Sequence, residues 1–194
     1  MRVVLASSNA GKVREFAALL AARDIEVVPQ TEFGITTPAE TGTTFFDNAL
    51  LKARHAAAAA ALPALADDSG IEVDALGGRP GVWSARYAGE QASDADNVAL
   101  LLRELADVPD ERRTARYRCV LVLVRDARDP DPLIGAGVWE GRVLMAPRGA
   151  GGFGYDPVFQ PAGSVISAAE LPAAQKNALS HRGQALRALL AALP

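Results

Sequence analysis

Cysteine is nearly absent from the sequence, which has one cysteine, Cys119, among 194 residues. A disulfide framework within one chain is therefore excluded. Cys119 begins the apolar run 119–122, so we expect a small buried hydrophobic side chain there and not a nucleophile.

Long hydrophobic runs are missing as well. The first apolar stretch, residues 3–6, is too short for the hydrophobic region of a signal peptide, and the run 56–66 is too short to span a bilayer. We therefore expect a cytoplasmic protein that does not enter a membrane.

An excess of basic residues is the third absence, because the formal net charge is −3. A duplex nucleic-acid binder would be expected to carry a basic stripe, so no nucleic-acid partner is predicted. Hydrophobic residues make up 49% and charged residues 22%, as in ordinary globular proteins. No internal repeat or low-complexity linker interrupts the chain, and its length suits a single domain over residues 1–194.

Strand-like and helix-like segments alternate in the first part of the chain. Strands are predicted at 3–6, 26–29 and 64–66, with helices following the first and second of them. A half-buried strand at 71–75 follows, and a helix is predicted from 93 to 105. The middle has consecutive strands at 117–124 and 134–139, and the latter is expected to continue as a hairpin over 140–144. This order predicts an α/β fold with a mixed sheet flanked by helices.

The stretch from 41 to 70 carries acids at both ends. Its middle reads as a helix that begins after Thr44, carries Lys52, and ends before Pro63. The short strand 64–66 then leads into Asp67 and Asp68. Together with Glu40, carboxylates at a strand end are well placed to hold a hard cation such as Mg²⁺. The alternative is that Asp-Asp-Ser-Gly is only a turn.

A small-residue loop, Ser7-Ser8-Asn9-Ala10-Gly11-Lys12, connects the first strand to the first helix. Backbone N–H groups and the helix dipole at such a junction favour an anion. The segment lacks the glycine spacing of a P-loop. A plain strand-to-helix turn with a solvated lysine is the alternative.

Two later segments also offer ligand-binding groups. The glycine-rich loop 149–157 places Phe153 and Tyr155 among glycines, which suits either base stacking or a mobile loop whose aromatic rings fold back onto the core. The segment 175–183 supplies hydrogen-bond donors from Lys176, His181 and Arg182 before an amphipathic C-terminal helix. The alternative for that segment is a solvated helix entry.

Five motifs, taken in order, resemble those of the inosine/xanthosine triphosphate pyrophosphatase (Ham1-like) family. They are Ser7 to Lys12, Glu40-Thr41-Gly42, Ala66 to Gly70, Gly152 to Asp156 and Ser180 to Gly183. The resemblance implies Mg²⁺-dependent hydrolysis of non-standard purine nucleoside triphosphates (ITP, dITP, XTP) to the monophosphate and pyrophosphate, which cleanses the nucleotide pool. It also implies an elongated mixed sheet, two lobes with a central nucleotide-binding cleft, and a homodimer.

The resemblance also implies a role for each matching residue. Glu40 and Asp68 would bind the metal, and Asp68 would accept the proton. The triphosphate would be held by Ser7, Ser8, Asn9, Ala10, Gly11 and Lys12. The nucleotide would be contacted by Ser69, Phe153, Gly154, Tyr155, Asp156, Lys176, His181 and Arg182. We add Lys52 from its position on the helix, as a positive group for the leaving pyrophosphate.

Two other functions remain open at this stage. A Maf-type pyrophosphatase that acts on pyrimidine or modified nucleotides would share the phosphate and metal parts but would not need Ser180-His181-Arg182. A non-catalytic nucleotide-binding module would keep the glycine-rich loop and would not need Asp68. A panel of nucleotide substrates would separate the three.

Overall fold

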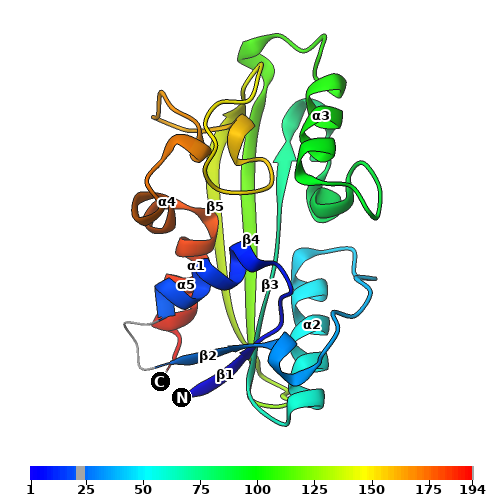
Figure 1. Cartoon of the computed structure of the whole chain (residues 1–194), viewed down its shortest axis with the longest axis vertical. Helices are drawn as coiled ribbons and strands as arrows, with labels where there is room; N and C mark the ends of the chain where they lie inside the picture. The colour runs from blue at the N-terminus through cyan, green and yellow to red at the C-terminus, as the bar shows by residue number, and fades with distance from the viewer. Residues whose placement is uncertain (21–24, 194) are drawn as a thin grey trace. The chain divides into compact units, whose positions relative to one another are not determined.

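The computed structural model describes residues 1–20 and 25–193. Its six-stranded sheet has the order β2-β1-β3-β4-β5-β6. The strands are β1 Arg2–Leu5, β2 Glu26–Pro29, β3 Ala64–Val73, β4 Thr114–Val124, β5 Leu133–Val143 and β6 Phe159–Pro161. β1 pairs parallel with β2 and β3, whereas β5 and β6 are antiparallel. The predicted mixed α/β fold is confirmed (Figure 1).

The α-helices of the described chain are α1 Ala10–Leu20, α2 Phe45–Ala60, α3 Asp94–Glu104, α4 Ala173–Leu179 and α5 His181–Ala191. Two of them begin where capping residues predict. Thr44 Oγ1 accepts a hydrogen bond from the Asp47 N–H (3.1 Å) at the start of α2, and Ser93 forms a capping box with Asp96 at the start of α3. Within the described residues, every helix is too short or too polar to cross a membrane.

The chain divides into two compact units. The first comprises Met1–Asp68, Cys119–Gly137 and Arg182–Pro194, and the second comprises Ser69–Arg118 and Val138–His181. We describe each unit by itself.

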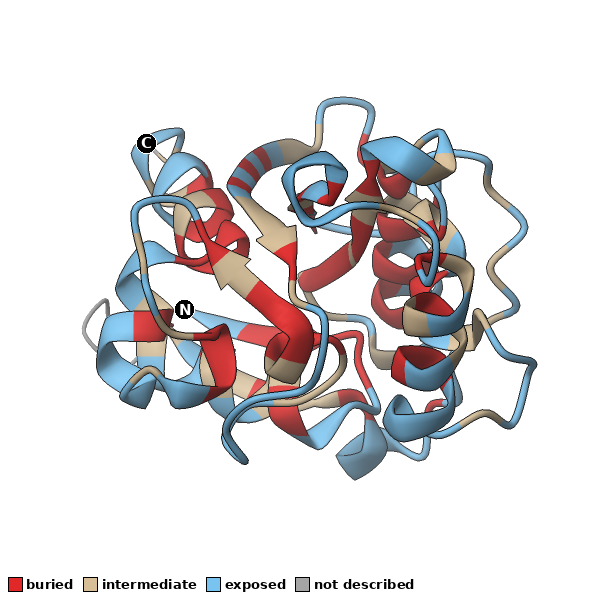
Figure 2. Cartoon of the chain, turned by 90° about the horizontal axis from the view of Figure 1, so that it is seen from above, coloured by how far each residue is buried: buried red, intermediate tan, exposed pale blue. Residues whose placement is uncertain are grey.

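In the first unit the strands bury both faces. Alternate residues of β1 point to opposite sides, so Val3 and Leu5 pack with α1 and α5, whereas Val4 packs with the alanine-rich face of α2. β4 repeats the pattern, with Cys119 in the first core and Val122 in the second. Cys119 is thus the small buried side chain that its apolar run predicts. Buried residues line the strands and the inner sides of the helices (Figure 2).

In the second unit one hydrophobic core joins α3 to the sheet. Leu101 of α3 and Leu105, the residue after the helix, are fully buried against residues of β3, β4 and β5, including Tyr117 and Trp139. Tyr155, from the glycine-rich loop, lies in the same core. The loop is therefore attached to the core through one of its two aromatic rings.

The predicted end of the third strand is wrong. β3 continues through Asp67-Asp68-Ser69-Gly70 to Val73, so the tetrapeptide is extended and does not turn. Close packing explains this: a Cβ on Gly70 would lie 2.2 Å from the Gly81 carbonyl oxygen, and Ser84 Oγ accepts a hydrogen bond from the Ile71 N–H (2.9 Å). Tertiary contacts therefore override the local turn preference.

One further expectation differs from the structure. β5 is continuous to Val143, so the expected hairpin within 140–144 is absent from this described stretch; the antiparallel partner of 141–143 is β6. A short 3-10 helix, Gly81–Arg86, follows β3, and its Ser84 is buried.

Candidate active site

The first helix begins at the predicted anion-binding loop. Ser7 is buried two residues after the end of β1, and its Oγ accepts a hydrogen bond from the Asn9 N–H (3.2 Å). Asn9 Oδ1 in turn accepts from the Lys12 N–H (3.1 Å), so Asn9 caps α1. Ser8, Asn9 and Ala10 are exposed at the positive end of the helix dipole. Local geometry thus presents a helix N-terminus to solvent at residues 7–12.

Lys12 also makes a buried ion pair with the first aspartate of β3. Its Nζ lies 2.8 Å from Asp67 Oδ2, and Asp67 is only 1% exposed. Arg182, at the start of α5, places its Nε 3.7 Å from the same oxygen and donates from Nη1 to Glu15. Burial alone would raise the pKa of Asp67, but the positive charges of Lys12, Arg182 and Lys52 outweigh it and hold that pKa well below its usual value. Asp67 is therefore a permanent anion near neutral pH.

The second aspartate of β3 faces two side chains of α2. Lys52 Nζ lies 3.0 Å from Asp68 Oδ1, and Asn48 Nδ2 donates to Asp68 Oδ2 at 3.1 Å. Asn48 and Lys52 are four residues apart on the helix, which places them on one face. Asn48 also accepts from the Gly42 N–H (2.8 Å) through its Oδ1. Helical spacing predicts Asn48 beside Lys52, but Asn48 is not among the predicted site residues.

Lys52 joins Asp68 to Glu40. The Lys52 ammonium lies 2.6 Å from Glu40 Oε1, so one cation bridges the two carboxylates that were predicted to bind metal. Burial raises the pKa of Asp68, and the negative charge of Glu40 raises it further. The positive charge of Lys52 lowers this pKa but does not cancel the rise, so the pKa of Asp68 lies above its ordinary value. Burial alone would lower the pKa of Lys52. The negative charges nearby have the larger effect and raise that pKa; they belong to Asp68, Asp67 and Glu40.

Side chains of the first unit hold the loop before Glu40 at Thr36 and Thr37. Gln30 Nε2 donates to Thr37 Oγ1 at 2.7 Å, and His55 Nε2 lies 3.0 Å from the Thr36 carbonyl oxygen. Because His55 is on α2, the segment that carries Glu40 is fixed to the helix that carries Lys52. We call Lys12, Glu40, Lys52, Asp67 and Asp68 the carboxylate–lysine cluster.

A second group of predicted residues meets around Asp156 in the second unit. Asp156 is 2% exposed, and its Oδ2 accepts from the Phe153 N–H (2.9 Å) and from Lys176 Nζ (2.7 Å). A Cβ on Gly152 would lie 2.1 Å from that oxygen, so the loop wraps the carboxylate only with glycine there. Lys176 Nζ lies 4.7 Å from the centre of the Phe153 ring, a cation–π distance.

The two aromatic rings of the glycine-rich loop have different environments. Phe153 is partly exposed, whereas Tyr155 is 4% exposed and donates from its hydroxyl to the Ser84 carbonyl oxygen (2.8 Å). Burial raises the pKa of Tyr155. The ring of Tyr155 is thus folded onto the core, which is the alternative considered for this loop. Phe153 is the more exposed ring of the two.

His181 lies among aromatic rings and is 3% exposed. Its ring is stacked on Tyr117 with centroids 4.5 Å apart and planes 5° apart, and Trp139 lies 6.4 Å away. The Tyr117 hydroxyl is 3.4 Å from Asp156 Oδ1. We call Tyr117, Phe153, Asp156, Lys176 and His181 the aromatic–lysine cluster.

The remaining predicted residues divide between the units. Arg182 contacts Glu15 and Asp67, so its contacts belong with the carboxylate–lysine cluster, whereas Lys176 and His181 belong to the other. Ser69 is half-buried directly after Asp68 on β3. Gly154 donates its N–H to Asp94 Oδ2 (2.6 Å). Sequence reasoning missed Tyr117 and Asp94, because a tyrosine in an apolar strand and an aspartate at a helix start both have ordinary structural roles.

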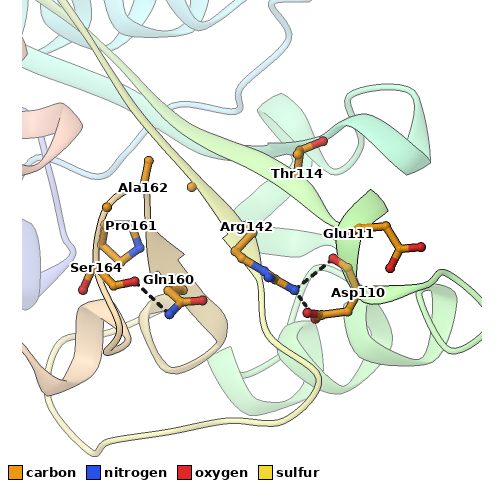
Figure 3. A pocket seen from close by; sticks show the side chains of 10 residues that line it. Asp110, Glu111, Thr114, Arg142, Gln160, Pro161, Ala162 and Ser164 are labelled. Carbon is orange, nitrogen blue, oxygen red and sulfur yellow. Dashed lines mark hydrogen bonds and ion pairs between the residues drawn. The ribbon is translucent and has the colours of Figure 1, made fainter.

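A surface cavity of about 470 Å³ lies elsewhere in the second unit (Figure 3). The cavity is lined by Asp110, Glu111, Thr114, Gly141, Arg142, Gln160, Pro161, Ala162, Gly163 and Ser164. None of these ten residues is among the predicted site residues. Arg142 donates to the Asp110 carbonyl oxygen (2.9 Å) and pairs with its carboxylate, and Gln160 donates to the Ser164 carbonyl oxygen (2.9 Å). These polar groups are engaged with one another, so the cavity does not identify a ligand.

Comparison with known proteins finds matches over nearly the whole chain. Residues 3–192 match the Ham1 family. A dITP/XTP pyrophosphatase of Escherichia coli (strain K12) is 55% identical over 192 residues, covering 99% of this chain and 98% of that protein. A dITP/XTP pyrophosphatase of Methylococcus capsulatus is 58% identical over 192 residues, covering 99% and 96% respectively.

Solved structures give the same result. The structure of a HAM1 protein from Coxiella burnetii is similar to this chain with a TM-score of 0.88 and 49% identity, covering 96% of this chain and 95% of that one. A nucleoside-triphosphatase / dITP/XTP pyrophosphatase from Mycobacterium abscessus has a TM-score of 0.77 and 44% identity, covering 98% and 99%. With its ordered motifs, its mixed α/β fold and these full-length matches, the chain belongs to the Ham1 family.

Proposed function

We propose that this protein is a nucleoside-triphosphate pyrophosphatase that hydrolyses dITP, ITP and XTP to the monophosphate and pyrophosphate and so cleanses the nucleotide pool. The observation that carries the proposal is the carboxylate–lysine cluster, found in a chain of the Ham1 family that resembles dITP/XTP pyrophosphatases over nearly its whole length. Water attack on a phosphate needs an acceptor for a proton and positive charge near the phosphates. The cluster supplies both.

Asp68 is the proton acceptor in this proposal. A general base is most effective when its pKa lies nearer to the working pH than that of a free carboxylate. Burial gives Asp68 a raised pKa, while Asp67 next to it has a lowered one. Two carboxylates whose environments separate their pKa values are suited to different roles, one as base and one as fixed charge.

Phosphates bind to the loop 7–12 in this proposal. The N-terminus of α1 offers backbone N–H groups and its dipole, and Lys12 adds a positive charge beside them. Lys52 adds a second positive charge next to Asp68, which suits the negative charge that develops on pyrophosphate as it leaves.

Mg²⁺ is the proposed cofactor, with Glu40 and Asp68 as its ligands. These carboxylates already share one cation, the Lys52 ammonium, which supports the view that their oxygens favour positive charge. Mg²⁺ commonly takes one or two protein carboxylates and completes its shell with water and phosphate oxygens, so the donor set fits. When bound, the metal would neutralise charge on the phosphates.

The metal requirement has a direct test. Protein treated with EDTA should lose ITP hydrolysis, recover it when Mg²⁺ is returned, and keep its circular dichroism spectrum throughout. Retention of the full rate in EDTA would reject the metal assignment.

Base recognition is assigned to the aromatic–lysine cluster. Phe153 offers a partly exposed ring for stacking, and Lys176 only donates hydrogen bonds, which suits the 6-oxo group of hypoxanthine and xanthine. Adenine presents an amino donor at the same position. Arg182 was predicted to share this pocket, but its contacts with Glu15 and Asp67 favour a role beside the phosphates.

The substrate panel tests the whole proposal. Pyrophosphate release should be measured with ITP, XTP, GTP, ATP and dTTP, with Asp68→Asn as the inactive control. Preference for dTTP would favour a Maf-type activity, and binding of ITP without pyrophosphate release would favour a non-catalytic module.

We also propose that the protein is a cytoplasmic homodimer. Trp83 is 54% exposed, and the Arg86 guanidinium lies 4.5 Å from the centre of its ring. Tryptophan and arginine are both enriched at protein–protein interfaces, which supports the dimer. Sedimentation at micromolar concentration tests this assignment. A monomer under those conditions would reject it.

A further inference from the structure

We infer that Tyr117 is a positioning residue for base recognition, because its ring fixes His181 and lies against the carboxylate that organises Phe153 and Lys176. This role rests on the proposed function and adds a residue that does not itself need to touch the nucleotide. The inference concerns the aromatic ring of Tyr117 more than its hydroxyl group.

The ring of Tyr117 is held from two sides. One face is stacked on His181 with the planes 5° apart, and Phe159 meets the ring with centroids 4.7 Å apart at an interplanar angle of 64°. Tyr117 itself is 7% exposed. Stacked and edge-to-face aromatic pairs both have preferred geometries, so this arrangement restricts how the His181 ring can turn.

The position of Tyr117 in the fold makes it a rigid support. It lies in the interior of β4, an 11-residue strand of the six-stranded sheet, and its neighbour in the alternation, Ala115, faces the same core. His181, in contrast, lies at the junction between α4 and α5, after Ser180. Side chains at functional sites are placed more accurately when a regular element supports them. Tyr117 thus connects a helix junction to the sheet.

The same residue reaches the glycine-rich loop through Asp156. The hydroxyl lies 3.4 Å from Asp156 Oδ1, a long hydrogen bond, while Asp156 Oδ2 makes shorter contacts with the Phe153 N–H and Lys176 Nζ. Loss of the hydroxyl should therefore change little. Loss of the ring should release His181 and leave space beside Asp156.

The first experiment follows the two histidines of the chain by proton NMR. A ring stacked on Tyr117 places the His181 carbon-bound protons in the shielding region, so their signals should lie upfield of those of exposed His55. Tyr117→Phe should keep that upfield position. Tyr117→Leu should move the His181 signals downfield and leave the His55 signals in place, which makes His55 an internal reference.

The second experiment measures kinetics with ITP and ATP on the same proteins. Tyr117→Leu should lower kcat/KM for ITP by about tenfold, mainly through KM, and should reduce the preference for ITP over ATP. Tyr117→Phe should stay within about threefold of the unmutated protein. Leu101→Ala removes volume from the same core on α3 and controls for general destabilisation; its ITP-to-ATP ratio should not change.

The outcomes are distinct. An unchanged KM and ITP-to-ATP ratio in folded Tyr117→Leu would overturn the inference, as would a loss in Tyr117→Phe equal to that in Tyr117→Leu. If Tyr117→Leu does not fold, the NMR spectra of the unmutated and Tyr117→Phe proteins still decide, because His181 signals without the upfield shift would exclude the stack. Failure of the unmutated protein to release pyrophosphate from ITP would instead reject the proposed function.

Discussion

Asp67 and Asp68 are adjacent in β3, yet their environments move their pKa values in opposite directions. Successive strand residues point to opposite faces, so the two side chains meet different partners. Asp67 pairs with Lys12 and is 1% exposed, whereas Asp68 lies against Asn48 and Lys52 of α2. One dipeptide therefore provides both a fixed anion and a titratable carboxylate.

Replacement of Asp68 by Asn should remove turnover and keep the fold. Loss of a general base typically lowers the rate ~10²–10⁴-fold. The Lys52 ammonium keeps its ion pair with Glu40 in the Asn variant, so the variant should remain folded at the assay temperature. Single-turnover rates and thermal melts measure the two effects. The exposed Asp107→Asn is the matched control, and near-normal turnover in Asp68→Asn would exclude Asp68 as the base.

The dependence of activity on pH should reflect the raised pKa of Asp68. Without a bound cation the folded pKa of Asp68 lies above the ordinary value of 3.8. The base acts as a carboxylate, so kcat/KM should rise as the pH increases through that pKa, and the rise should move to lower pH as the Mg²⁺ concentration increases, because a bound cation favours the carboxylate. Profiles of kcat/KM from acidic to neutral pH, at low and at saturating Mg²⁺, measure this. A flat profile across that range would contradict the assignment of Asp68.

Asp67→Asn should destabilise the protein at neutral pH. Removal of one partner from a buried ion pair typically costs about 3–5 kcal/mol. The folded pKa of Asp67 is depressed, so its stabilising contribution is present above the unfolded-state value of about 3.9 and is lost as the pH falls from there towards the folded pKa. Urea unfolding of both proteins at neutral and strongly acidic pH measures the difference. Equal stability at neutral pH would show that the pair contributes nothing.

Lys176 and Arg182 should have different effects on selectivity. The unmutated protein should prefer ITP to ATP by a factor on the order of 10⁴. Lys176→Met should reduce that ratio by about tenfold to a hundredfold, since a hydrogen bond from a charged donor is worth about 1.5–3 kcal/mol. Arg182→Ala should lower kcat for both substrates and leave the ratio within about threefold, because Arg182 contacts Glu15 and Asp67. Measurements of kcat/KM decide, and a changed ratio in Arg182→Ala would return Arg182 to the base pocket.

The sequence predicts the regular elements well where local signals agree with packing. Thr44 and Ser93 mark helix starts through their caps, and the apolar run of β4 predicts its strand. The continuation of β3 beyond Asp68 could not be predicted, because Asp-Ser-Gly favours a turn locally. Two contacts with residues farther along the chain keep this segment extended. Gly70 packs closely against the Gly81 carbonyl oxygen, and the Ile71 N–H donates to Ser84.

For the candidate site, the sequence predicts which residues take part but not which side chains they contact. The motifs identify most of the site residues, and helical spacing alone places Lys52 near the acids. The hydrogen-bond partners depend on tertiary structure. The Tyr155 hydroxyl donates to the Ser84 carbonyl oxygen, and Arg182 donates to Glu15. Ring stacking between Tyr117 and His181 joins residues 64 positions apart (181 − 117), and no local pattern indicates it.

Gly70 packs so closely against the Gly81 carbonyl oxygen that the backbone leaves no room for a side chain at position 70. Any side chain there would push against the short 3-10 helix that contains Ser84, which holds both Ile71 and the hydroxyl of Tyr155. Position 70 should therefore accept no replacement in a saturation screen scored by activity. Such intolerance would reflect displacement of Tyr155 and its loop, so a position with no tolerated substitution need not be one that touches substrate.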